Sequence, residues 1–111
     1  MSELVSACDG LLTALMISAE PKMNPAECAK LRNLSNARLK QLKMLNTSNQ
    51  RKMIDYLKKE IRAKGKDLDK FASFGSAAEF LDILKINVNV PDDIVDSEVR
   101  TSLRSLISVL D

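Results

Sequence analysis

The fold is decided by residues 24–66, which read NPAECAKLRNLSNARLKQLKMLNTSNQRKMIDYLKKEIRAKGK. The stretch opens with a helix-start signal, because Asn24 can cap, Pro25 suits the first helical position and Glu27 can complete a capping box. Residues 22–66 hold 13 of the 17 Lys and Arg against three acids, a local net charge of +10. The flanks are acidic, at −3 for residues 1–21 and −5 for residues 67–111, so the total of +2 hides a basic middle.

Apolar periodicity predicts two helices in this basic stretch. One runs to about Leu45, and the other, capped by Thr47 or Ser48, runs to Lys64 and stops at Gly65. Arg38 interrupts the apolar face of the first helix. It is either a snorkelling side chain with a buried stem, or a residue that reaches a subunit junction or a ligand. The predicted inner residues are Cys28, Leu31, Leu34, Leu42 and Leu45 with Leu39 at the edge, then Met53, Ile54, Leu57 and Ile61.

Residues 2–19 predict a preceding helix with an unusually wide apolar face. Leu4, Cys8, Leu11 and Leu15 follow helical spacing, and their apolar neighbours widen the arc to about 200°. Two arrangements satisfy such an arc: a central helix in a monomer, or a helix that faces both its own core and a second subunit. Gly10 lies inside the pattern and predicts a close crossing of another element.

The C-terminal third predicts shorter helices. Asp67 can cap a short segment, Ser76 can open another, and Asp96 or Ser97 can cap the last, whose apolar stripe is Val99, Leu103, Leu106, Ile107 and Leu110. Residues 86–90 alternate like a strand but have no evident partner, so we expect an extended connector. The sequence therefore predicts an all-α single domain (1–111) of about five helices. A basic helical hairpin region (1–66) lies at its centre, followed by an acidic helical region (67–111).

The residues that carry most enzymatic and metal chemistry are missing or badly spaced. The chain has no histidine and two cysteines, Cys8 and Cys28, which we expect to be buried thiols, whereas a structural zinc site takes four Cys or His ligands. The acids at 92, 93, 96 and 98 lack the spacing of a calcium loop. We find no Gly-rich phosphate loop and no nucleophile elbow. We therefore expect a non-enzymatic protein without a cofactor or metal.

No membrane segment is expected from the pattern of apolar residues. No uninterrupted apolar run approaches the roughly 20 residues of a membrane span, and the N-terminus lacks the basic segment of a signal peptide. These features predict a cytoplasmic protein.

The outer face of the residue 25–45 helix predicts a surface for nucleic acid. Five residues, which we call the basic strip, fall within about 100° of the helical wheel without an acid among them. Cations suit phosphates and Asn suits sugar or base edges, whereas a merely solvated face usually mixes charges. The candidate contacts are the basic strip, Arg32, Asn33, Asn36, Lys40 and Lys43, together with Arg51, Lys52 and Lys59 on the next helix.

Three segments resemble a known family: Leu15–Asn24 (LMISAEPKMN), Lys43–Ser48 (KMLNTS) and Ile54–Leu57 (IDYL). They are similar to parts of the small helical RNA-silencing suppressors of insect nodaviruses, over roughly residues 4–66. The resemblance implies a homodimer, paired through the first two helices as a four-helix bundle, that lies along double-stranded RNA. It implies RNA contacts at Asn33, Asn36, Lys40, Lys43 and Arg51. The folded, acidic C-terminal third departs from that family, which usually ends in a short tail.

Three functions are compatible with the basic surface. The first is binding of double-stranded RNA by shape, as in a viral suppressor of RNA silencing, because a rigid face of Lys, Arg and Asn without aromatics fits A-form duplex. The second is a helical protein-interaction module that binds an acidic partner. The third is a helical scaffold whose basic face is simply solvated.

Overall fold

The N-terminal helix α1 (Glu3–Ala19) is the central element of the computed structural model of this chain, which describes residues 2–65, 67–74, 77–91 and 97–111. A 3-10 turn (Glu20–Lys22) follows α1. The described ranges hold six α-helices and no strand, so the all-α prediction is confirmed. The remaining helices are α2 (Pro25–Lys43), α3 (Thr47–Ala63), α4 (Leu68–Phe74), α5 (Ala77–Ile83) and α6 (Ser97–Leu110).

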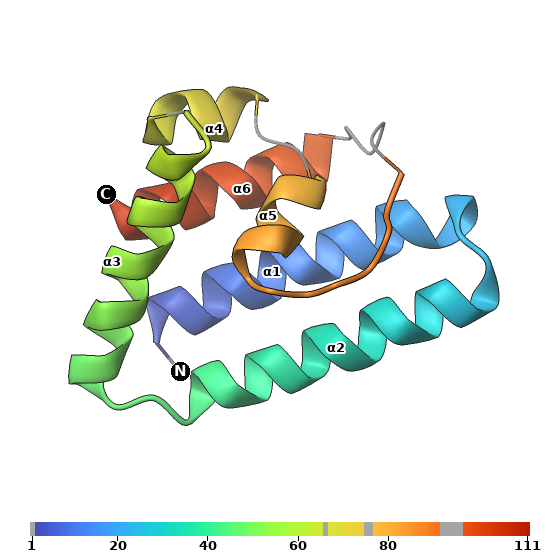
Figure 1. Cartoon of the computed structure of the whole chain (residues 1–111), viewed down its shortest axis with the longest axis horizontal. Coiled ribbons are helices and arrows are strands. Elements are labelled where there is room, and N and C mark those ends of the chain that lie inside the picture. Colours follow the sequence, from blue (N-terminus) through green and yellow to red (C-terminus); the bar gives the residue numbers. More distant parts are fainter. Residues whose placement is uncertain (1, 66, 75–76, 92–96) are drawn as a thin grey trace.

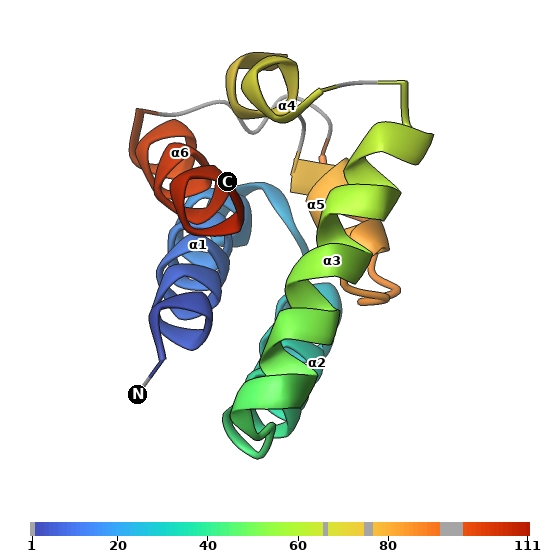
Figure 2. The ribbon, with the colours of Figure 1, turned by 90° about the vertical axis from the view of Figure 1, so that its left-hand side faces the viewer.

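The helices enclose α1 within a single chain. α2 turns back beside α1 as an antiparallel hairpin, and α6 packs along another side of α1 (Figures 1 and 2). The wide apolar arc of α1 is thereby covered by two helices of the same chain. Its buried residues are Leu4, Val5, Cys8, Leu11, Leu12, Ala14, Leu15 and Ala19.

α3 follows α2 and lies at a steep angle to it (Figure 1). α4 and α5 lie between α3 and α6 in the chain. α3 packs against α4, α5 and α6, which closes the core at this end of the bundle. The radius of gyration is 13.2 Å, close to the value of about 13 Å for a compact domain of this length. Residues 86–91, after α5, form neither a helix nor a strand, in keeping with the connector that the sequence predicted.

Local hydrogen bonds set the helix boundaries. The Asn24 side chain accepts from Glu27 N at 2.8 Å and Asp67 accepts from Lys70 N at 2.8 Å, as predicted. The cap of α3 lies one residue earlier than predicted, because Asn46, rather than Thr47 or Ser48, accepts from Asn49 N at 2.8 Å. Asn46 has the extended backbone that a cap requires, whereas Thr47 and Ser48 are already helical, and Asn is among the preferred capping residues. The predicted caps Ser76 and Asp96 lie outside the described residues.

Gly65 ends α3 with a left-handed backbone (φ 78°), as predicted. Gly10 does not mark a close crossing, because a Cβ atom built there would meet nothing within 4 Å. Gly10 is exposed, and it lines a hollow between α1 and the start of α6.

The buried face of α2 is turned relative to the prediction. Leu39, placed at the edge, is 6% exposed, whereas Leu34, placed inside, is 37% exposed. α2 packs against α1, and its buried side consists of Leu31, Ser35, Leu39 and Leu42. The inner positions of α3 and α6 follow the prediction: Leu57, Ile61, Val99, Leu103, Leu106, Ile107 and Leu110 are buried, and Met53 and Ile54 are half-buried.

By length and composition, Glu3–Lys22 is apolar enough to cross a membrane, contrary to what the shorter apolar runs suggested. The core helix of a soluble protein passes the same test. In this fold the apolar side chains of α1 are the ones that contact α2 and α6.

Candidate functional site

The basic strip lies on the solvent side of α2. Arg32, Asn33, Asn36, Lys40 and Lys43 are all exposed. At 1.5 Å per residue the strip is about 16 Å long. The rigidity of the surface comes from the opposite face of α2, whose buried side chains Leu31, Ser35, Leu39 and Leu42 hold the helix against the core.

One end of the basic strip is neutralised by a residue that follows α1. Arg32 Nη2 forms an ion pair with Glu20 Oε1 from the 3-10 turn. No acid lies on the strip in the helical wheel, but the fold brings one to it from the neighbouring segment. The cations available to a ligand therefore concentrate toward the C-terminal end of α2, at Lys40 and Lys43.

The predicted cations of α3 are exposed, but they do not continue the basic strip of α2 along a straight line. Arg51 and Lys52 lie near the start of α3, just beyond the turn that follows Lys43, and Lys59 lies two turns further on. Because α3 runs steeply to α2 (Figure 1), a straight rod cannot follow both helices along their lengths. Lys40 and Lys43 near the end of α2, and Arg51 and Lys52 near the start of α3, flank the turn between the two helices, which we call the corner, whereas Lys59 lies further along α3.

The cations at this corner lack acidic partners. Within the described ranges, none of Lys40, Lys43, Arg51, Lys52 and Lys59 forms an ion pair. Lys64, at the end of α3, does so: its Nζ lies 2.7 Å from Asp82 Oδ2, and this hydrogen bond raises the pKa of Lys64. Lys40 and Lys43 of the basic strip and Arg51 and Lys52 at the start of α3 thus carry charge that no acid of the described chain pairs with.

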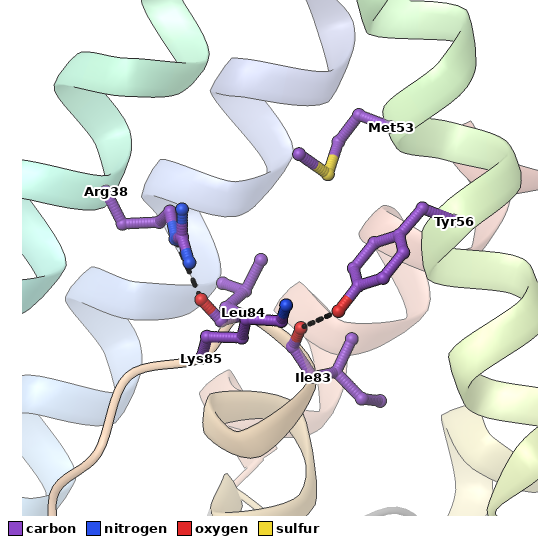
Figure 3. Close-up of a pocket in the computed structure, with 6 residues that line it drawn as sticks. All are labelled: Arg38, Met53, Tyr56, Ile83, Leu84 and Lys85. Atoms are coloured by element: carbon purple, nitrogen blue, oxygen red, sulfur yellow. Dashed lines mark hydrogen bonds between the residues drawn. The ribbon is translucent and has the colours of Figure 1, made fainter.

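Arg38, which interrupts the apolar face of α2, caps the end of α5. Its Nε donates to the Leu84 carbonyl oxygen at 2.8 Å (Figure 3). Its Nη1 donates to Gln41 Oε1 at 2.8 Å. The Tyr56 hydroxyl donates to the adjacent Ile83 carbonyl oxygen at 3.4 Å. The last carbonyls of a helix have no partner within the helix and carry its negative end, so a guanidinium suits this place.

A cavity of about 240 Å³ opens beside this contact (Figure 3). Lys85 Nζ lies 5.8 Å from the centre of the Tyr56 ring. The sequence prediction missed Met53, Tyr56 and Lys85 as site residues, because they meet only when α2, α3 and the end of α5 are packed together. The lining residues are Arg38, Met53, Tyr56, Ile83, Leu84 and Lys85.

The two cysteines differ in their surroundings. Cys8 is fully buried, and burial raises the pKa of its thiol to about 12, so it stays protonated at neutral pH. Cys28, predicted to be buried, is half-buried, and its thiol lies 3.7 Å from the Glu20 carbonyl oxygen. Both are free thiols. Among the described residues no group of three or more Cys, Asp or Glu is placed to hold a metal ion.

Comparisons with models of protein families, with curated proteins and with solved structures gave no match to this chain.

Proposed function

We propose that this chain binds double-stranded RNA by its shape, through Lys40, Lys43 and the neighbouring strip residues of α2, with Arg51 and Lys52 at the corner. The observation that carries the proposal is the group of exposed cations without acidic partners in the described chain. A-form RNA is recognised through phosphates and 2′-hydroxyls across its shallow minor groove. Lys supplies charge for the phosphates, and the amides of Asn33 and Asn36 can bond 2′-hydroxyls.

Recognition of a duplex fits this surface better than recognition of a single strand. Single strands are held largely by bases stacked on exposed aromatic rings. Phe71 and Phe80 are buried, and Tyr56 is turned into the cavity beside α5 rather than toward the basic strip. The exposed side chains of the basic strip are cationic or amide groups, which can bond phosphates and sugar hydroxyls but offer no ring on which a base could stack.

The proposal needs only one chain. A homodimer through the first two helices, as the resemblance implies, stays a prediction, and its solution mass is the measurement that checks it. The wide arc of α1 no longer argues for a dimer, since α2 and α6 cover it.

The test is the salt dependence of binding to a blunt RNA duplex of about 20 base pairs and arbitrary sequence, measured by fluorescence anisotropy. The variant Lys40→Gln with Lys43→Gln should weaken binding and reduce the slope of log K against log salt by about 2. A matched control removes two exposed lysines elsewhere, Lys30→Gln with Lys70→Gln, and should change the slope by less. Equal losses in both double variants would contradict the assignment to the basic strip.

A second variant strengthens the interface instead of weakening it. Glu20→Gln removes the acid that pairs with Arg32 and should tighten RNA binding. A gain of affinity cannot be explained by damage to the fold. Duplex DNA, single strands and a poly-glutamate peptide are the competing ligands. Preferential binding of the acidic peptide would favour the protein-interaction function over RNA.

A further inference from the structure

The cavity between α2, α3 and the end of α5 combines apolar walls with two cations. Met53, Tyr56, Ile83 and Leu84 form its apolar walls. Arg38 and Lys85 line the same space (Figure 3). A ligand pocket in a protein typically has such a lining, largely apolar with a few polar groups that fix the ligand's orientation.

The two cations have unused capacity for an anion. Arg38 uses Nε and Nη1 in its hydrogen bonds to Leu84 and Gln41, which leaves N–H groups of the guanidinium free to donate. Lys85 has a cation–π contact with Tyr56 and no ion pair within the described residues. Asp82, the acid closest to Lys85 in sequence, is bound by Lys64. No carboxylate lines the described cavity, so an anion would meet two cations without a competitor.

The backbone at Lys85 is an independent indication. Lys85 has φ 60°, and it is the one residue other than glycine with positive φ in the described chain. It occupies the position after α5 where a Schellman motif forms: Ile86 N donates to Leu81 O at 2.8 Å and Lys85 N to Asp82 O at 3.0 Å. Glycine is the usual residue there because it adopts this backbone without strain. The chain instead places a lysine there, with its ammonium group over the Tyr56 ring.

We propose that this cavity binds a small carboxylate with an aromatic or branched apolar body. The carboxylate would lie between Arg38 and Lys85, where a guanidinium and an ammonium group give charge-assisted hydrogen bonds. The body would pack on the Tyr56 ring and the Met53 thioether, both of which contact aromatic groups favourably. A cavity of about 150 Å³ admits benzene, so 240 Å³ has room for a ring with a short acidic arm.

The fluorescence of Tyr56 can be used to measure binding in this cavity. Tyr56 is the single tyrosine and there is no tryptophan, so intrinsic fluorescence reports on the cavity directly. We expect 3-phenylpropionate to change this fluorescence saturably, and the neutral 3-phenylpropionamide to bind about tenfold more weakly because it lacks the charge. Acetate, which has the charge without the body, should compete poorly. Equal binding of acid and amide would overturn the proposal, as would the absence of a saturable change.

The variant Lys85→Gly separates binding from folding. It removes the ammonium group and replaces a strained residue by the one that this backbone prefers, so its melting temperature should not fall below that of Lys85→Ala. Its affinity for 3-phenylpropionate should fall about tenfold. Lys40→Gln, which removes one exposed charge outside the cavity, should leave that affinity unchanged. Unchanged affinity of Lys85→Gly would exclude the site. Its RNA binding should be retained, so this proposal can fail independently of the RNA interface.

Discussion

Arg38 Nε donates a 2.8 Å hydrogen bond to the carbonyl oxygen of Leu84, 46 residues further along the chain. This contact joins α2, in the basic half of the chain, to the end of α5 in the acidic half. Tyr56 of α3 donates to the neighbouring carbonyl of Ile83. The short helix α5 therefore has its C-terminal end held by side chains from both basic helices, in addition to its own Schellman hydrogen bonds.

Replacing Arg38 should destabilise the fold, although an arginine on an apolar helix face looks expendable. Arg38→Ala leaves the half-buried Leu84 carbonyl without its donor and should lower the free energy of unfolding by about 1–2 kcal/mol. Urea denaturation measures the change. Lys40→Ala, on the exposed side of the same helix, is the control and should stay within about 0.5 kcal/mol of the parent chain. Equal effects of the two substitutions would show that the contact with Leu84 contributes nothing.

Ser35 offers a stabilising substitution. It is 0% exposed, and its hydroxyl has no hydrogen-bond partner within the described structure. Burying a hydroxyl without a partner costs free energy, and alanine is also the better helix former. Ser35→Ala should therefore raise the free energy of unfolding by about 1 kcal/mol. Ser6→Ala, at an exposed position of α1, gains helix propensity alone and should stabilise the chain less.

Two glycines should respond in opposite directions to the same substitution. Gly10→Ala, in the middle of α1 with open space around it, should stabilise the fold by about 0.5–1 kcal/mol, since alanine loses less chain entropy in a helix. Gly65→Ala, at φ 78°, should destabilise it by about 1 kcal/mol, because a Cβ atom strains that backbone. Thermal denaturation of both variants checks the pair. A loss of stability in Gly10→Ala would indicate a close neighbour that this structure lacks.

Stability should fall at alkaline pH in a way that depends on Cys8. Burial raises the pKa of its thiol from 9.0 to about 12. Below pH 9 the thiol is protonated in both states and the pH has no effect through it. Between pH 9 and about 12 only the unfolded chain releases the proton, so folding loses stability as the pH rises. At pH 10 the free energy of unfolding should be lower than at pH 8 by about 1.4 kcal/mol through this thiol.

The measurement for Cys8 compares urea denaturation at pH 8 and pH 10 for the parent chain and for Cys8→Ala. Other groups that titrate in this range are common to both, so the difference between their pH dependences isolates the thiol. The Cys8→Ala chain should lose less stability than the parent on going to pH 10. Identical losses would mean that Cys8 is not shielded from ionisation.

The sequence by itself determined the features that depend on near neighbours in the chain. The class of fold, the cap at Asn24, the stop at Gly65 and the apolar stripe of the last helix all follow from residues within one or two turns of each other. The exposure of Lys40 and Lys43 follows for the same reason, because helical spacing puts them opposite the buried leucines. Helix capping and helical periodicity depend only on residues that are close together in the sequence, so these features can be predicted without the tertiary structure.

Only the tertiary structure decided which elements meet. The wide apolar arc of α1 could be covered by helices of the same chain or by a second subunit. In the structure, α6 packs against α1 in addition to α2. Leu39 is buried and Leu34 is exposed, the reverse of the prediction. Which side of α2 faces the core depends on how the other helices pack against it, and the helical wheel of α2 alone does not contain that information. The Glu20–Arg32 pair and the Arg38–Leu84 contact join residues 12 and 46 positions apart, and the cavity brings Arg38 together with Lys85. Helical periodicity carries no information over that distance, because the contacts depend on how whole helices are oriented.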